Sequence, residues 1–156
     1  MEIVIKGFKV LIDQEDYEKI MGYSWTIYKV ADGGIHIRAC IKGTKPQKNI
    51  LLWRLITNCP DELQVDHRNH NRFDNRKSNL RVCTAMQNSR NKLNRIDNTS
   101  GCKGVYWNKR AKKWHAQIGV NGKRKHIGFF DSKENAYKEY RKFAELYFKE
   151  YVPEIL

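Results

Sequence analysis

Alternating apolar and polar positions dominate the first fifty residues of the chain. The opening EIVIKGFKVLID predicts two short strands around Gly7, and QEDYEKIM, which follows Asp13, predicts a short helix with acidic residues in its first turn. The runs SWTIYKV and IHIRACIK flank the turn signal DGG and predict a hairpin. The apolar segment NILLWRLI, which ends before a Cys-Pro pair, is expected to be buried.

The pattern changes after ELQVDH. Positions 65–91 read VDHRNHNRFDNRKSNLRVCTAMQNSRN and hold six asparagines and five arginines but few apolar residues. We expect a strand, a polar loop, the short strand NLRVC, and a helix through AMQNSRNK that Thr84 caps. Packing alone does not require so many polar residues, and their presence indicates a chemical role.

The last third of the chain predicts a small sheet and one helix. NRIDNTSG, residues 94–101, has the composition of a linker. CKGVYWNKR, KKWHAQIGV and KRKHIGFF are expected strands, with a tight turn at Asn121-Gly122, and Ser132 opens an amphipathic helix in KENAYKEYRKFAELYFKEY. The chain is therefore expected to be α+β, with domains at 1–93 and 102–156 and a linker at 94–101.

Positive charge is concentrated toward the end of the chain. The 156 residues include 30 Lys and Arg against 17 Asp and Glu, and residues 101–130 hold 8 basic groups without an acid. Such a face suits the phosphates of double-stranded DNA, because each neutralised phosphate releases counterions. A solvated basic surface without a nucleic-acid partner is the open alternative.

The sequence also disfavours several classes of protein. It has no signal-like apolar run and no apolar stretch that approaches a membrane span, so we expect no membrane partner and a role in the compartment of synthesis, the cytoplasm. Its four cysteines are widely spaced without CxxC, which indicates reduced, mostly buried thiols rather than a zinc knuckle or a disulfide framework.

The polar stretch contains the groups that phosphodiester hydrolysis requires. Such a site needs a hard divalent cation on oxygen ligands and a neutral imidazole that takes a proton from water. If Val65 points into the core, Asp66 leaves on the opposite face, and a turn at the strand end can bring His67 beside it. Asn88 on the following helix supplies a second oxygen for one divalent ion, Mg²⁺ or Mn²⁺.

Positions 65–91 resemble the His-Asn-His nuclease motif of the phage and intron-associated branch, and WRLITNCPDELQ fits the usual lead-in. The resemblance implies a ββα-metal fold in which Asp66 and Asn88 hold the ion and His67 is the general base. Asn79 resembles the middle Asn, which orients the imidazole or ties down the loop.

The same resemblance implies supporting roles for other residues of the segment. Asn75 and Arg76 are expected to hold the loop together, and Arg76 and Arg81 to contact DNA, Arg81 at a phosphate. A contact with phosphate or solvent is expected for His70. Trp53 departs from the family, in which His often precedes the Arg-Leu pair, and an auxiliary role for that His is in doubt here.

Residues 100–149 resemble the AP2 DNA-binding domain, through GVYW, KWHAQI, HIGFF and ENAYKEYRKFAEL. This family implies a three-stranded antiparallel sheet that enters the major groove and a helix packed behind it. Trp107 and Trp114 either stack on sugar or pack into the sheet. The side chains expected to bind DNA are Lys103, Tyr106, Trp107, Lys109, Arg110, Gln117, Arg124, Lys125 and His126.

Together, the two resemblances imply a metal-dependent, site-selective DNA endonuclease of homing type, encoded by a bacteriophage and acting in the bacterial host as a monomer or weak dimer. The target sequence, and the choice between nicking and double-strand cleavage, stay open. The alternative is a non-catalytic, sequence-specific DNA-binding regulator that uses the AP2-like sheet. A zinc-stabilised adaptor is a more distant alternative.

Overall fold

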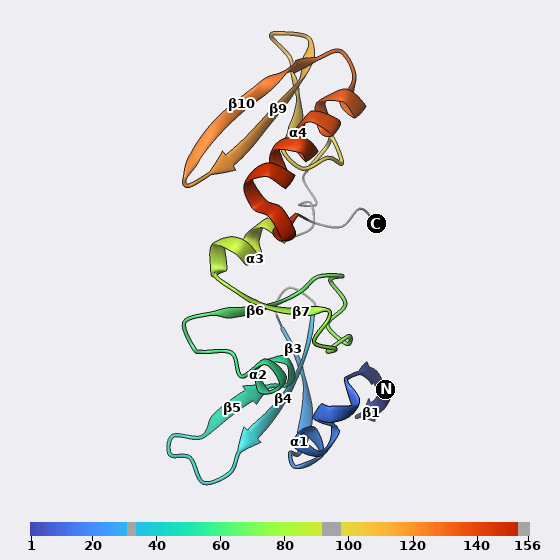
Figure 1. Cartoon of the computed structure of the whole chain (residues 1–156), viewed down its shortest axis with the longest axis vertical. Helices are drawn as coiled ribbons and strands as arrows, with labels where there is room; N and C mark the ends of the chain where they lie inside the picture. The colour runs from blue at the N-terminus through green and yellow to red at the C-terminus, as the bar shows by residue number, and fades with distance from the viewer. Residues whose placement is uncertain (31–33, 92–97, 153–156) are drawn as a thin grey trace. The chain divides into compact units, whose positions relative to one another are not determined.

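The computed structural model describes residues 1–30, 34–91 and 98–152. They form a mixed α+β structure with several small antiparallel sheets (Figure 1). The chain divides into two compact units, one from Met1 to Ser89 and one that begins at Arg90. Half of the expected linker, residues 94–97, lies outside the described residues, so the linker stays a prediction.

The first unit consists of two hairpins, a three-stranded sheet and short helices. Gln14–Asp16 form a 3-10 turn ahead of the first helix. The elements are β1 (Glu2–Ile5), β2 (Phe8–Leu11), α1 (Tyr17–Met21), β3 (Trp25–Lys29), β4 (Ile35–Ile41), β5 (Lys48–Leu51), α2 (Leu52–Thr57), β6 (Gln64–His67), β7 (Leu80–Cys83) and α3 (Ala85–Asn91), of which Arg90 and Asn91 already belong to the second unit. The strands pair as β1-β2, β3-β4-β5 and β6-β7, which confirms the expected strands and the strand, loop, strand and helix order of the polar segment.

The core of the first unit explains the apolar run near its middle. NILLWRLI divides into β5 and α2, and α2 buries Leu52, Trp53, Leu55 and Ile56, which confirms the expected burial. Leu52 packs in one cluster with apolar residues from the N-terminal hairpin, α1 and β4. The same apolar cluster packs against the β6-β7 hairpin, which carries the polar segment.

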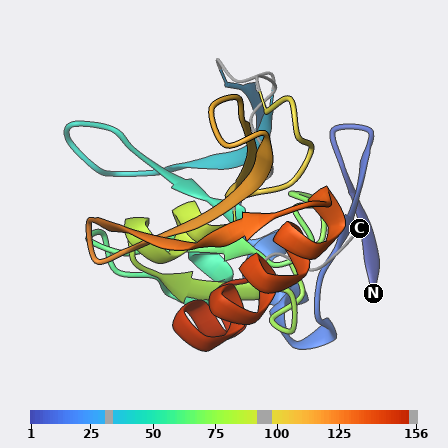
Figure 2. The same ribbon diagram turned by 90° about the horizontal axis from the view of Figure 1, so that it is seen from above.

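The second unit is a three-stranded antiparallel sheet covered by one helix. Its strands are β8 (Val105–Asn108), β9 (Lys113–Val120) and β10 (Lys123–Phe130), in the order β10-β9-β8. The helix α4 (Lys133–Phe148) lies along one face of this sheet (Figures 1 and 2). Asn121 and Gly122 both have left-handed φ angles, of 51° and 74°, as the expected tight hairpin turn requires.

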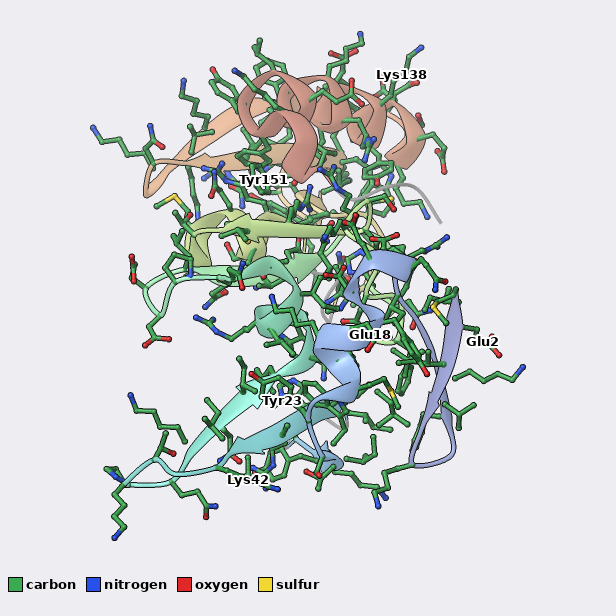
Figure 3. The ribbon with its side chains drawn as sticks, turned by 60° about the horizontal axis from the view of Figure 1, so that its bottom comes forward. Glu2, Glu18, Tyr23, Lys42, Lys138 and Tyr151 are labelled. Atoms are coloured by element: carbon green, nitrogen blue, oxygen red, sulfur yellow. The ribbon has the colours of Figure 1, made fainter. Side chains whose placement is uncertain are left out.

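Close contact between α4 and the sheet depends on one glycine. Gly104 has a φ angle of 74°, and a Cβ there would lie 2.2 Å from the ring of Tyr140 on α4. Burial raises the pKa of Tyr140 to about 12. Ser132 caps α4 by accepting a hydrogen bond from the backbone N of Asn135 at 3.2 Å, and Lys138 points outward from the helix (Figure 3).

Two further expectations concern membranes and thiols. Within the described ranges, no helix is both long and apolar enough to cross a membrane. The four cysteines are free thiols, as expected. The expectation that they are mostly buried was wrong, because Cys83 is buried whereas Cys40, Cys59 and Cys102 are partly exposed.

Candidate active site and nucleic-acid interface

An ion pair links the two strands of the β6-β7 hairpin. Asp66 lies opposite Arg81 in the register, and both side chains are buried. Arg81 Nη2 and Nε lie 2.6 Å and 2.7 Å from Asp66 Oδ2. Arg81, which was expected to reach a phosphate, thus directs its guanidinium at Asp66 and compensates the buried negative charge.

His67 lies at the end of β6. It is the last residue of the strand, and the turn that was expected at the strand end begins at Arg68. The imidazole is buried and makes an edge-to-face contact with Trp53, with ring centroids 5.2 Å apart. Burial lowers the pKa of His67, and contact with Asn75 and the charge of Asp66 offset part of this effect. The imidazole is therefore neutral near neutral pH, as a proton acceptor must be.

Asn75 fixes which nitrogen of this imidazole carries the proton. Its Nδ2 donates to the backbone carbonyl of Arg72 at 3.1 Å, and its Oδ1 lies 3.4 Å from His67 Nε2. Because Oδ1 is an acceptor, Nε2 is the protonated nitrogen and Nδ1 carries the lone pair. The sequence had indicated a loop role for Asn75, whereas its fully buried amide also contacts the imidazole.

Asn79 is one of several residues that hold the polar loop together. Its Nδ2 donates to the carbonyl of Asp74 at 2.7 Å, and its Oδ1 accepts from the backbone N of Asn69 at 3.1 Å. Of the two expected roles, the one seen is tying down the loop. Arg76 makes two hydrogen bonds to the buried Asp74 carboxylate, at 2.8 Å and 2.7 Å, and these bonds lower the pKa of Asp74. Arg76 is thus committed to the loop, as expected.

The N-terminal hairpin braces this loop. Leu11 at the end of β2 donates its backbone N to the carbonyl of Phe73 and accepts from the backbone N of Asn75, both at 2.8 Å. The Phe8 and Phe73 rings stack with centroids 5.2 Å apart. The Asp13 carboxylate, expected at the start of a helix, accepts from the backbone N of Lys77 at 2.7 Å. Sequence reasoning missed this support, because partners more than sixty residues apart leave no local pattern.

Asn88 reaches the same side of the hairpin as Asp66. Thr84 and Gln87 form a reciprocal capping box that starts α3, which confirms the expected cap. Asn88 Nδ2 donates to Gln64 Oε1 at 2.8 Å. Gln64 and Asp66 are two residues apart on β6 and share a face, so α3 presents Asn88 to the face that carries Asp66.

A carboxylate and an amide oxygen fit a hard ion such as Mg²⁺ or Mn²⁺. Within residues 1–30, 34–91 and 98–152, no group of three or more His, Cys, Asp or Glu side chains is arranged to hold a metal. Cys83 lies opposite Gln64 in the hairpin, and burial raises its pKa to about 11, so it stays a neutral thiol. Asp66 and Asn88 are the ligands that the sequence predicts on this face, and their assignment to a metal ion stays a prediction.

The second unit brings together only part of the expected DNA-binding set. We call the sheet face opposite α4 the outer face. Residues 114, 116, 118 and 120 of β9 pack toward α4, so Gln117 lies on the outer face with its register partner His126, and Tyr106 and Arg124 lie there too.

The other expected residues point elsewhere. Trp107 makes an edge-to-face contact with Trp114 on the α4 side and stays 46% exposed, and Lys125 Nζ lies 3.0 Å from the Tyr147 hydroxyl of α4. Lys103 Nζ donates to the carbonyl of Arg90 at 2.7 Å. The turn between β8 and β9 exposes Lys109 and Arg110.

The segment that carries the β6-β7 hairpin is similar to a known protein family. Residues 49–90 match the family model of HNH endonucleases. This match indicates a DNA endonuclease. The matched segment contains Trp53, Asp66, His67, Asn79 and Asn88.

Two viral proteins are similar to the chain. Protein 3.8 of Escherichia phage T7 is 29% identical over 103 residues, which are 65% of this chain and 85% of that protein. A protein of Acanthamoeba polyphaga mimivirus described as an uncharacterized HNH endonuclease is 34% identical over 92 residues, or 59% of this chain. The chain covers 46% of the mimivirus protein. No solved structure matches the chain.

Proposed function

We propose that the protein is a metal-dependent, site-selective DNA endonuclease of homing type. The match of residues 49–90 to HNH endonucleases carries this proposal, because that segment contains the adjacent Asp66 and His67. In this proposal, the first unit cuts one phosphodiester bond and the outer face of the AP2-like sheet holds the duplex. A phage origin and action in the bacterial cytoplasm agree with the similarity to the phage T7 protein.

His67 acts as the general base. Its Nδ1 takes a proton from the attacking water, while Nε2 stays protonated toward Asn75 Oδ1 at 3.4 Å. The Trp53 ring keeps bulk water from one side of the imidazole, which holds it neutral. Asn79 acts indirectly, because its two hydrogen bonds fix the loop that carries Asn75.

Asp66 and Asn88 are the residues that would hold the divalent ion. When bound, the ion stabilises the negative charge that develops on the phosphate and the departing 3′ oxygen. The contact of Arg81 with Asp66 Oδ2 orients the carboxylate. One site per chain makes nicking the default outcome for a monomer.

The decisive test is cleavage by the full chain with Mg²⁺ or with EDTA. His67→Ala is expected to lower the cleavage rate by about 10²- to 10⁴-fold while DNA affinity stays nearly intact. His70→Ala is the matched control, in the same loop, and should have a much milder effect. Equal effects of the two substitutions would remove His67 from its role, and a reversed order would move the base to His70.

The metal hypothesis has its own readout. Asp66→Ala should abolish the activity that depends on added ion, whereas Asn88→Asp should retain it, because a carboxylate is also an oxygen ligand. Cleavage that persists in EDTA would eliminate the metal site. Specific DNA binding without any cleavage would instead support the non-catalytic regulator.

A further inference from the structure

The outer face of the second unit carries an aromatic and imidazole cluster that depends on a β-bulge. The pairing of β10 with β9 shifts between His126 and Gly128, so that His126 lies opposite Gln117 and Phe129 opposite His115. Without the bulge, residues 126 and 129 would point to opposite faces, because their separation is odd. The bulge therefore places both rings beside His115.

His115 is buried although it lies on the face opposite α4. Its ring stacks on His126 and Phe129, with centroids 4.7 Å and 4.8 Å away, and meets Tyr106 edge to face at 4.7 Å. Only 8% of His115 is exposed, whereas His126 is exposed and Tyr106 is 39% exposed. Solvent and ligands therefore reach this cluster through Tyr106, His126 and Phe129, whose ring is 45% exposed.

Both ring nitrogens of His115 are engaged. Nδ1 contacts the Tyr106 hydroxyl, and Nε2 lies 2.5 Å from His126 Nδ1. A neutral imidazole has one donor and one acceptor nitrogen, so the proton positions along this chain of three residues are coupled. The nitrogens between the two rings share a single proton, and two N–H groups cannot face each other there.

The cluster can therefore take up one further proton and keep its contacts. Burial and the neighbouring His126 lower the pKa of His115, and His126 is the ring that solvent reaches. His126 Nδ1–H then donates to His115 Nε2, and His115 Nδ1–H donates to the Tyr106 oxygen. This order turns the Tyr106 hydroxyl proton outward, where it can donate to a ligand.

The charged groups around the cluster favour an anion. Arg124 is on the same face of β10, and residues 101–130 contain no acid. Lys113 lies on this face of β9 and pairs with Asp131, the first acid after β10, at 3.0 Å. On the α4 side, Lys125 lies against Tyr147, and Tyr140 is neutral. The outer face thus offers Arg124, His126 and the Tyr106 hydroxyl to a phosphate.

We propose that the hydrogen-bonded residues Tyr106, His115 and His126 form a binding site for a DNA phosphate, and that binding of the phosphate is coupled to the uptake of a proton. This proposal rests on the DNA-binding half of the proposed function. Binding of the phosphate stabilises the protonated pair, so affinity for DNA increases as pH falls through the range in which imidazoles titrate.

Binding of the full chain to duplex DNA in EDTA, from pH 8 to pH 6 at constant ionic strength, tests the proposal. Wild-type affinity should rise about tenfold toward pH 6. His126→Gln should lose this rise and remain weak, whereas His126→Arg should bind tightly at every pH. His36→Gln, which removes an imidazole from β4, is the matched control and should keep the wild-type slope.

Calorimetry in buffers of different ionisation enthalpy provides an independent count of protons. Near pH 6.5, wild-type binding should take up about half a proton more than binding by His126→Gln, which matches a tenfold rise over two pH units. A pH-independent affinity for wild type, or an unchanged slope in His126→Gln, would overturn this proposal alone. Absence of binding at every pH would refute DNA binding itself, and this proposal with it.

Discussion

A carboxylate in place of Asn75 should shift the pH dependence of cleavage. In Asn75→Asp, a negative charge replaces the amide oxygen that lies 3.4 Å from His67 Nε2. An anion beside an imidazole stabilises the imidazolium and raises its pKa. Because the general base works in its neutral form, the acidic limb of kcat/KM should move to higher pH.

The size of the shift follows from the contact distance. Two unit charges 3.4 Å apart attract by about 5 kcal/mol at an effective dielectric constant of about 20. Burial of the new carboxylate and loss of the bond from Asn75 Nδ2 to Arg72 reduce this gain, so the pKa of His67 should rise by about 1–3 units. At pH values between the acidic limb of the wild type and that of Asn75→Asp, the variant should cleave about 10- to 1000-fold more slowly than the wild type. Its rate should recover at higher pH.

The assay is the initial rate of cleavage of a DNA substrate from pH 5.5 to 9.5 at fixed Mg²⁺, together with an NMR titration of His67. The matched control is Asn71→Asp, which adds the same charge to the same loop and keeps the acceptor for the backbone N of Phe73. If the two variants show the same limb and the same titration of His67, Asn75 does not position the imidazole. Thermal unfolding checks that Asn75→Asp is folded.

Other predictions concern the second unit. Gly104→Ala should destabilise this unit by more than about 1 kcal/mol, because the new Cβ would meet the ring of Tyr140 and because the backbone has a positive φ. A smaller change in urea unfolding would show that α4 shifts to make room for the Cβ. Ser132→Ala should cost about 1 kcal/mol in the same measurement, and no change would mean that the cap is dispensable. Arg124→Gln should reduce the slope of log affinity against log salt by about 0.9, and an unchanged slope would place Arg124 away from phosphates.

Local patterns were sufficient to predict most elements of the fold. The turn at Asn121-Gly122, the Ser132 cap and the Thr84 cap each depend on neighbouring residues, and each is found where the sequence predicts it. The start of the first helix differs, because the Asp13 carboxylate binds the backbone of Lys77 instead. Such a long-range bond competes with a cap, and sequence spacing contains no sign of it.

The candidate site was predictable in its residue types but not in its contacts. The sequence indicates Asp66, His67 and Asn88 by their chemistry and spacing. It does not reveal that Arg81 pairs with Asp66, because this partner is set by the register of β6 and β7. Asn75 looked like one more loop asparagine, and only its complete burial beside the imidazole distinguishes it from Asn79.

The outer face shows most clearly why strand register limits prediction from sequence. Lys125 and His126 were both expected to bind DNA, yet neighbouring strand residues point to opposite faces, and Lys125 contacts Tyr147 on the α4 side. Phe129 was not among the residues expected to bind DNA, and strict alternation from His126 would place it on the α4 face. One extra residue in β10 reverses that count and brings Phe129 onto His115. Deletion of Ile127 should therefore keep the cluster, because it removes only the extra residue and leaves Phe129 two positions after His126, opposite His115 on the outer face.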